Sequence, residues 1–458
     1  MRIAFFSPLP PKRTGIATYS QYLGAALSEV AEVHLFDTDV TNTMISSKVP
    51  VKDFARNPQF LTKLDDYDGC IYQFGNNPWY HLEIYKVFLR KPGIVVLHDT
   101  VLYFLIAGLN IGGLIKEFCL NYGVKRLNEV WELLESCPNG DILRYKHPER
   151  YPFLKRVFDH ATAIIVHSKT AKKQIQAAGY NGVVKVIDLL RYENDWALPN
   201  KAEKDELKAK LGIAEEDLVI GCFGFIGATK RLPSLIDALD RIGSNFNFKL
   251  LIVGEGDDSQ LKEQILKRGL EDKVIRPGFV QDDDFSKYLA VTDIVVNLRY
   301  PSMGETSATL IQAFSQAKPC IVTDHAWFSE LPNDCVHKVA YDQREVKDLV
   351  KSLLQLASDP VARQRLGERA HEYVESHCSP QKVARDYLEV VRSVSSSSAL
   401  NPTVVSHLVK VEQEALEPAV NSNWVDEYFI SRISELVPSQ KQSANKGNSF
   451  DIISTFKR

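Results

Sequence analysis

The residues best suited to chemistry lie together in the segment Asn297–Asp324. A loop rich in turn formers carries the acid Glu305, and the hydroxyl residues Thr306 and Ser307 follow it directly. Apolar residues then recur at helical spacing, so we expect a helix to begin near Ser307. The free N–H groups and the dipole of a helix start suit an anion such as a phosphate. The segment therefore predicts an anion site, although an ordinary capped helix of an α/β domain would show the same local pattern.

A second candidate for anion binding is the basic pair Lys230 and Arg231. It follows an apolar strand expected at residues 218–223 and a turn containing Phe225, and it precedes a helix expected at residues 232–242. A cation at a helix start is unfavourable against the helix dipole, which suggests that an anion binds beside it. We therefore expect a phosphate contact from Lys230 or Arg231.

Histidines end two of the predicted strands in the first part of the chain. The strongly apolar residues 93–97 stop at His98 and Asp99, and residues 163–166 stop at His167 and Ser168. Side chains at the carboxyl end of a parallel strand lie where open α/β sheets bind their ligands. His98 is a candidate for substrate contact, with a purely local hydrogen bond as the alternative. His167 is expected to be structural, because Ser168 reads as the cap of the helix that follows.

Two acidic segments were considered for metal binding. Asp37-Thr38-Asp39 has the DxD spacing that holds divalent cations in some enzymes, but it follows a strand, where a short acidic turn is common. Residues 282–284 are three aspartates that open a predicted helix and serve as capping charges. We expect no metal.

Composition limits the protein class. A chain of 458 residues that is 45% hydrophobic can form two large cores, and a net charge of −3 argues against a general nucleic-acid binder. The seven cysteines are scattered and form no CxxC pair, which favours a reducing cytoplasm. The start of the chain lacks a signal-peptide layout. An apolar run at residues 101–115 is too short to span a bilayer, so only peripheral contact with the inner face of a membrane stays open.

Strands and helices alternate along the chain, and the pattern restarts near residue 218. This restart is the main evidence for two Rossmann-like domains in tandem. The first βα loop, residues 7–14, lacks the GxGxxG pattern, so a nicotinamide site is not supported. Lys12 and Arg13 in this loop are read either as ligand contacts or as solvated charges.

The anchor segment resembles the donor-binding segment of the GT-B retaining glycosyltransferases of family 4 (group 1). The tail of the family pattern is matched by residues 313–319, AFSQAKP. Gln312 occupies the slot of a glutamate that holds ribose hydroxyls in the family, and Glu305 lies one residue after the slot of the other glutamate. The resemblance implies donor binding by Thr306, Ser307 and Gln312, and contact of Glu305 with the sugar.

The same resemblance extends over about residues 1–395. It implies that Gly15, in PPKRTGIATYS, belongs to a glycine loop over the donor, and that His98 contacts the donor sugar. It gives Lys230 or Arg231 a role in gripping the diphosphate, although Phe225 stands where the family has an arginine. It also implies that the backbone around Phe279 meets the nucleobase.

The resemblance implies an α/β GT-B fold, with two Rossmann-like domains facing across a crevice and a C-terminal extension. The expected divisions are an acceptor-side domain at 1–190, a donor domain at 191–378, a helix returning to the first domain at 379–395, and a tail at 396–458. The implied function is transfer of a sugar, with retention and without metal or cofactor, from a UDP- or GDP-linked donor. The acceptor is left open as a glycan, a lipid-linked molecule or a small molecule.

Two alternatives stay open at this stage. One is a nucleotide-sugar epimerase of the same fold, which would change its substrate without an acceptor. The other is a non-catalytic sugar-nucleotide-binding module, which would release no nucleotide from any donor. The displaced glutamate pattern and Phe225 keep this second alternative open.

Overall fold

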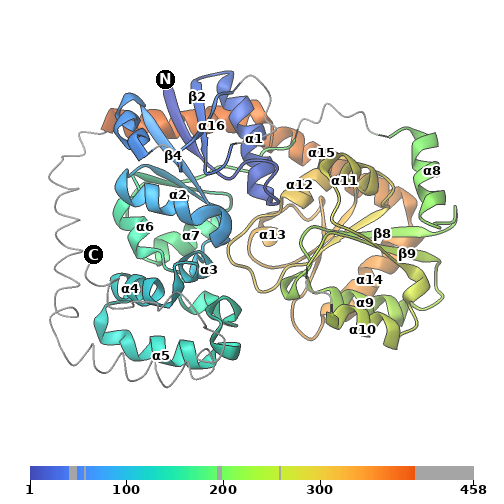
Figure 1. Ribbon diagram of the computed structural model, residues 1–458. Coiled ribbons are helices and arrows are strands. Elements are labelled where there is room, and N and C mark those ends of the chain that lie inside the picture. Colours follow the sequence, from blue (N-terminus) through green and yellow to red (C-terminus); the bar gives the residue numbers. More distant parts are fainter. Residues whose placement is uncertain (41–48, 56–57, 193–198, 257–258, 398–458) are drawn as a thin grey trace. The chain divides into compact units, whose positions relative to one another are not determined.

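The computed structural model describes residues 1–40, 49–55, 58–192, 199–256 and 259–397. They form two compact units, one made of Met1–Val166, Gln174–Lys185 and the chain from Tyr387, the other of His167–Lys173 and Val186–Asp386. Residues 193–198, near the start of the predicted donor domain, and nearly all of the predicted tail at 396–458 lie outside the described residues. Each unit is a mainly parallel sheet with helices against it (Figure 1).

The first unit is built on a seven-stranded sheet in the order β3-β2-β1-β4-β5-β6-β7, parallel from β3 to β6. Its central strands β1, β4 and β5 are mostly buried and apolar, as expected for a sheet covered on both faces. The strands are β1 (Arg2–Phe6), β2 (Glu32–Asp37), β3 (Val51–Asp53), β4 (Gly69–Phe74), β5 (Ile94–Leu97), β6 (Ala163–Val166) and β7 (Val184–Val186).

Two helices of this unit begin at side-chain caps. α1 (Gly15–Ser28) is capped by Thr14, and α2 (Pro78–Arg90) is capped by Asn77, whose side chain accepts from the N–H of Trp79. α2 also has proline at its first position, where the missing N–H costs nothing. α7 (Lys169–Ala177) begins after Ser168, whose hydroxyl accepts from the N–H of Ala171 at 2.9 Å, so the predicted cap is confirmed.

A helical insertion connects β5 to β6. It contains α3 (Tyr103–Ala107), α4 (Asn110–Tyr122), η2 (Val124–Arg126), α5 (Leu127–Ser136), η3 (Pro138–Gly140), η4 (Ile142–Arg144), η5 (Pro148–Arg150) and α6 (Lys155–His160). The apolar run at 101–115 forms α3 and the start of α4, and most of its large side chains are buried inside this unit. Core packing therefore accounts for that run. In the described part of the chain, no helix has both the length and the apolarity needed to cross a membrane.

The second unit has a six-stranded parallel sheet in the order β10-β9-β8-β11-β12-β13. The strands are β8 (Leu218–Phe223), β9 (Phe248–Val253), β10 (Val274–Gly278), β11 (Ile294–Asn297), β12 (Cys320–Thr323) and β13 (His337–Val339). The direction of strand order reverses between β8 and β11, which are neighbours in the sheet. The region at the carboxyl ends of these two strands is therefore the topological switch point of the sheet.

The helices of the second unit follow the strand–helix alternation that the sequence predicted. They are α8 (Lys201–Lys210), α9 (Leu232–Ile242), α10 (Ser259–Lys267), α11 (Asp282–Ala290), α12 (Ala308–Ser315), α13 (Trp327–Glu330), α14 (Glu345–Ser358), α15 (Pro360–His377) and α16 (Pro380–Ser397). The core is a cluster of aliphatic side chains from β8, β9, β11, α9 and α14. α8 begins at a capping box formed by Asn200 and Glu203.

The last helix, α16, packs against the first sheet from Tyr387 onward (Figure 1). The Tyr387 hydroxyl lies 2.9 Å from the Tyr19 hydroxyl of α1, and a Cβ added to Gly69 of β4 would lie 2.9 Å from Val391. The C-terminal part of α16 therefore packs into the first unit, which also contains the N-terminus of the chain.

Candidate functional site

The switch point of the second sheet is formed by the loops that leave β8 and β11. The β8 loop turns at Gly224, whose φ of +95° favours glycine. A Cβ at Gly224 would lie 3.3 Å from the Thr309 hydroxyl and 3.5 Å from the Lys230 amine. Thr309 stands in the first turn of α12, so this turn brings Lys230 close to the start of the helix predicted at Ser307. Ligands of open α/β sheets bind at such a point.

The neighbouring turn after β9, with Gly254 and Gly256, is structural. A Cβ on either glycine would meet a backbone oxygen of the β8 loop, at 2.1 Å for Gly254 and 1.9 Å for Gly256. These two glycines are required because the backbones of the two loops touch.

Lys230 is a strongly perturbed base. Its amine donates a hydrogen bond to the carbonyl of Phe223 at 2.8 Å. Burial, and then repulsion by Arg299, lower the pKa of Lys230 to about 7, and Glu305 acts weakly in the opposite direction. An anion next to this amine would favour its charged form and raise its pKa again.

Arg299, in the loop after β11, is a site residue that the sequence reasoning missed. Its guanidinium lies 3.4 Å from the carboxylate of Glu305, and its side chain is 19% exposed. Within the described part of the chain, its Nε–H is buried and makes no hydrogen bond. Its backbone N–H donates to the hydroxyl of Thr323 at 2.9 Å, which fixes the loop. The only signal in the sequence is a basic residue placed two positions after a buried strand.

Glu305 is held by its own turn. Its carboxylate accepts hydrogen bonds from the Met303 N–H at 2.6 Å and from the Ser302 hydroxyl at 3.0 Å, and the side chain is 17% exposed. Lys230, Arg299 and Glu305 thus form a cluster of two cations and one anion, which we call the switch-point cluster. Its formal charge with Lys230 protonated is +1, and a diphosphate would be the complementary partner.

The helix start beside this cluster is the one that the sequence predicted. Ser307 is the N-cap of α12, and its buried hydroxyl accepts from the Leu310 N–H at 3.2 Å and from the Asn297 amide at 2.8 Å. The Ser307 hydroxyl therefore already accepts two hydrogen bonds from groups of the protein itself. Thr306 precedes the cap and is half-buried, and Gln312 is half-buried one turn into the helix.

Arg231 has a different role from Lys230. Its guanidinium forms a two-pronged ion pair with Glu345, which is 2% exposed and also accepts from the Ser234 hydroxyl. Arg231 also takes a left-handed conformation at the cap of α9, with φ of 53°. These contacts give Arg231 a clear structural function and leave Lys230 as the member of the basic pair at the switch point.

Two phenylalanines of this unit have exposed side chains. Phe225, in the β8 loop, is 72% exposed, and Phe279, directly after β10, is 39% exposed. Both follow the carboxyl ends of their strands, on the edge of the sheet that carries the switch-point cluster. Phe279 remains the predicted neighbour of a nucleobase.

In the first unit, His98 belongs to a buried polar network. Its Nε2 lies 2.7 Å from the side-chain oxygen of Gln73, and its ring packs edge-on against Tyr19 at 5.2 Å. Gln73 is fully buried and also contacts the hydroxyl of Tyr387, which lies 2.9 Å from that of Tyr19. Because the amide oxygen of Gln73 can only accept, Nε2 of His98 carries the proton and the ring is fixed in one orientation.

The other histidine that ends a strand is structural. Burial lowers the pKa of His167 to about 4, and its Nδ1 lies 2.8 Å from the carbonyl of Ile187. This agrees with the prediction for His167.

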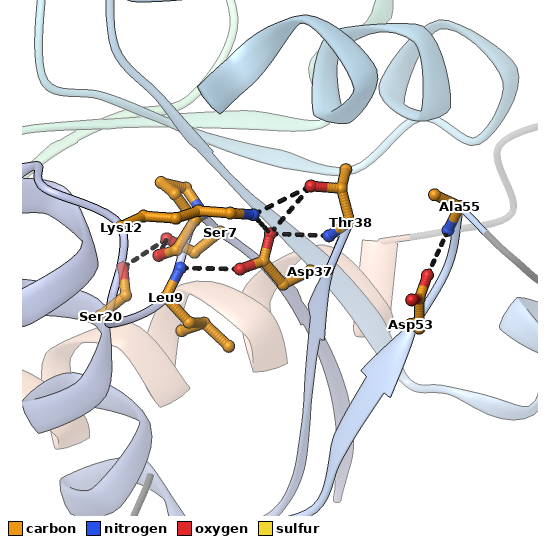
Figure 2. Close-up of polar contacts among 9 residues, drawn as sticks. Ser7, Leu9, Lys12, Ser20, Asp37, Thr38, Asp53 and Ala55 are labelled. Atoms are coloured by element: carbon orange, nitrogen blue, oxygen red, sulfur yellow. Dashed lines mark hydrogen bonds and ion pairs between the residues drawn. The ribbon is translucent and has the colours of Figure 1, made fainter. Parts of the chain in front are cut away.

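The first βα loop is tied to the acidic turn after β2 (Figure 2). The Lys12 amine pairs with the Asp37 carboxylate and donates to the Thr38 hydroxyl at 2.9 Å, and the Leu9 N–H donates to Asp37 at 2.9 Å. Asp37 is 1% exposed, so this carboxylate stabilises the loop, and the reading of Lys12 as a solvated charge is wrong. Gly15 opens α1 in an exposed position where an added Cβ would meet nothing within 4 Å.

The residues proposed for chemistry are thus divided between the units. His98 and Gly15 lie in the first unit, and the remaining predicted site residues lie in the second. Among the described residues, no three histidine, cysteine or acidic side chains are grouped so that they could hold a metal ion.

Two α/β units, each built on a mainly parallel sheet, are the architecture of the GT-B fold. The model of the family "Glycosyl transferases group 1" matches residues 203–373. Anabaena HepE, crystallised with UDP-glucose, matches with a TM-score of 0.62 at 17% identity, over 86% of this chain and 100% of that one. Sucrose-phosphate synthase from Thermosynechococcus elongatus matches with a TM-score of 0.62 at 16% identity, over 87% and 100%.

Similarity to curated proteins is more limited in extent. N-acetyl-alpha-D-glucosaminyl L-malate synthase of Bacillus anthracis is 25% identical over 189 residues, which is 41% of this chain and 48% of that protein. The chain matches about half the length of the first curated relatives, 48% and 59%.

Proposed function

We propose that this protein is a retaining glycosyltransferase that moves a sugar from a nucleoside-diphosphate donor to an acceptor. The observation that carries the proposal is the switch-point cluster beside the start of α12, where Arg299 lies 3.4 Å from the carboxylate of Glu305 and both residues act electrostatically on Lys230. The group 1 domain at residues 203–373 contains all three residues of the cluster. The GT-B fold of the chain supports the same reading.

In the proposed reaction, the bond between the sugar's anomeric carbon and the diphosphate oxygen breaks, and its electron pair stays on the diphosphate. Negative charge grows on that oxygen as the bond lengthens. Lys230, Arg299 and the N–H groups at the start of α12 are fixed positive groups that stabilise this charge. The acceptor hydroxyl forms the new bond to the anomeric carbon and gives up its proton to the departing diphosphate oxygen.

Glu305 and His98 are proposed to hold hydroxyl groups of the donor sugar. Glu305 keeps its position through the Met303 N–H and the Ser302 hydroxyl, and Gln73 orients His98. A polar group that its neighbours already hold in one orientation loses little conformational entropy when it binds a substrate. Such a group can therefore position the donor sugar for reaction. Retention of anomeric configuration rests on the family resemblance alone.

For the donor, UDP-linked sugars are the first to test, because Anabaena HepE was crystallised with UDP and with UDP-glucose. GDP-linked sugars are the second class. We propose that no divalent metal or other cofactor is needed, because Lys230 and Arg299 would supply fixed positive charge to a diphosphate at the switch-point cluster. We also propose a cytoplasmic location, which fits the seven free cysteines.

The test is a screen of UDP- and GDP-sugars for thermal stabilisation, followed by assays of every stabilising donor with and without sugar acceptors. We expect at least one donor to raise the melting temperature and to release nucleoside diphosphate. A donor that changes its sugar without any acceptor would instead identify an epimerase. Binding without release of nucleotide under any condition would identify a non-catalytic module.

A further inference from the structure

The first unit contains a pocket that the proposed donor chemistry does not use. It has a volume of about 570 Å³, within the range of about 300–1,000 Å³ that small-molecule sites occupy. Its walls come from the first turns of α2, the turn between α3 and α4, the η3–η4 segment and Thr38 after β2. α2 follows β4, which adjoins β1 where the strand order of the first sheet reverses. The pocket therefore lies beside the ligand-binding edge of this sheet.

An exposed tryptophan forms one wall of the pocket. Trp79 is 76% exposed, whereas Trp131 and Trp327 are 6% and 5% exposed. Its backbone N–H is bound by the Asn77 cap at 3.0 Å, so the residue sits at a fixed point of α2. An indole exposed to water does not gain the favourable free energy of burying its apolar surface. A ligand that covers the face of the indole would provide that burial.

The charged side chains that line the pocket are two carboxylates, Glu83 and Asp141. Each has a basic partner outside the lining: Glu83 pairs with Lys86 at 2.7 Å, and Asp141 pairs with Arg144 at 3.3 Å. Both carboxylates retain lone pairs that can accept from hydroxyl groups. Asn110, also on the wall, accepts from the Gly113 N–H through its side-chain oxygen at 3.1 Å, so its amide N–H groups are the donors it has left for a ligand.

The pocket is preformed by close packing. A Cβ on Gly108, at the turn between α3 and α4, would lie 2.2 Å from Cβ of Pro78, so the backbone of Gly108 packs directly against the ring of Pro78, and both residues line the pocket. The side chain of Asn76 also accepts from the N–H groups of Phe104 and Leu105 and thereby fixes α3 to the end of β4. A rigid pocket loses little ordering entropy when a ligand binds.

From these features we infer that the pocket binds a neutral saccharide, the sugar portion of the acceptor. An aromatic face beside hydroxyl-accepting carboxylates and an amide donor matches a sugar ring, which has an apolar C–H face and a rim of hydroxyls. The two carboxylates disfavour an anionic ligand, and their place in the wall disfavours an acyl chain. The assignment of this saccharide as the acceptor rests on the proposed glycosyltransferase function.

The binding test uses saturation-transfer NMR on the full chain with maltose, lactose and cellobiose, and with octyl glucoside as a probe that has both a sugar and an acyl chain. We expect at least one disaccharide to bind, with its ring C–H protons saturated. Trp79→Ala should weaken that binding by about tenfold or more, as expected for loss of a central aromatic contact, and Trp79→Phe should retain most of it. Leu266→Ala, an equally exposed apolar site on α10 of the second unit, is the matched control and should change nothing.

Three results would overturn the inference: no disaccharide binding to the wild-type chain, equal binding by Trp79→Ala, or saturation of only the octyl chain of octyl glucoside. UDP affinity measured on the same samples separates this inference from the proposed function. If the protein binds UDP but no disaccharide, the saccharide pocket is rejected and the proposed donor site is retained. If the protein binds a disaccharide but neither UDP nor GDP, the glycosyltransferase proposal is rejected and the saccharide pocket is retained.

Discussion

The guanidinium of Arg299 repels the protonated amine of Lys230. Burial of the amine, and then this repulsion, lower the pKa of Lys230 to about 7. Because Arg299 repels Lys230, charging both groups costs free energy in the unliganded protein, and Glu305 offsets only part of that cost. A bound diphosphate would offset the rest. The pair is therefore arranged for an anion that arrives from outside.

The first prediction is proton uptake when UDP binds at about pH 8. Lys230 is largely neutral above pH 7 in the free protein, and a diphosphate raises its pKa, so binding adds up to about one proton. Affinity for UDP should fall as the pH rises above 7, because each binding event must then take up a proton. Calorimetry in buffers with different ionisation heats measures the uptake. Lys230→Met should abolish it, and an uptake that persists in this variant would assign the proton to another group.

The second prediction separates Arg299 from Arg231. Arg299→Met should weaken UDP binding by about 1.5–3 kcal/mol, the size of a charge-assisted contact, and should affect uridine much less. Equal losses for UDP and uridine would reject a phosphate contact.

Arg231→Met is the matched comparison for that experiment. It leaves Glu345 buried without its partner, which should destabilise the fold by on the order of 3 kcal/mol while UDP affinity stays near that of the wild type. Thermal unfolding and calorimetry on the same variant test both parts. A large loss of UDP affinity without loss of stability would return Arg231 to the donor site.

The third prediction concerns Glu305→Gln. The amide oxygen of glutamine can still accept from the Met303 N–H, so the turn should survive with a small fall in melting temperature. Turnover should nevertheless fall strongly, because the charge beside the sugar and the two cations is lost. A normal rate with a lowered melting point would make Glu305 a purely structural residue.

The fourth prediction concerns the network around His98. Gln73→Met removes the acceptor that fixes the proton on Nε2 of His98, and Tyr387→Phe removes a hydroxyl that contacts both Gln73 and Tyr19. We expect Gln73→Met to lower kcat and to shift its pH profile, since the ring can then change tautomer. Tyr387→Phe should cost about 1 kcal/mol of stability, the net worth of a buried hydrogen bond, with a smaller effect on kcat. An unchanged pH profile in Gln73→Met would limit His98 to packing.

Much of the fold could be predicted from the sequence because its signals are local. The start of α12 at Ser307 follows from a hydroxyl cap before an apolar periodic run, and α9 occupies the predicted residues 232–242. The helical insertion between β5 and β6 was not predicted in detail. Its apolar run is interrupted by Asn110 and two glycines, so periodicity alone does not show where one helix ends and the next begins.

The site was harder to predict than the fold, because it depends on contacts between distant residues. Arg231 pairs with Glu345, and Lys12 pairs with Asp37, and neither partner is indicated by local sequence. Arg299 reaches the cluster only because β11 lies next to β8 in the sheet. A phosphate role for Lys230 could be proposed from its place at a helix start, but the repulsion that lowers its pKa could not.

The most direct test of the central claim is turnover of nucleotide-sugars by the wild type and by Lys230→Met, in the presence of the disaccharides named above. The account predicts that the wild type releases UDP or GDP from one donor and forms a new glycosidic bond, in excess EDTA as well as in magnesium. It also predicts that Lys230→Met keeps its fold and loses at least about tenfold in rate, or ~1.4 kcal/mol of barrier stabilisation. Equal rates in the two proteins, or a wild-type rate that depends on added metal, would contradict it.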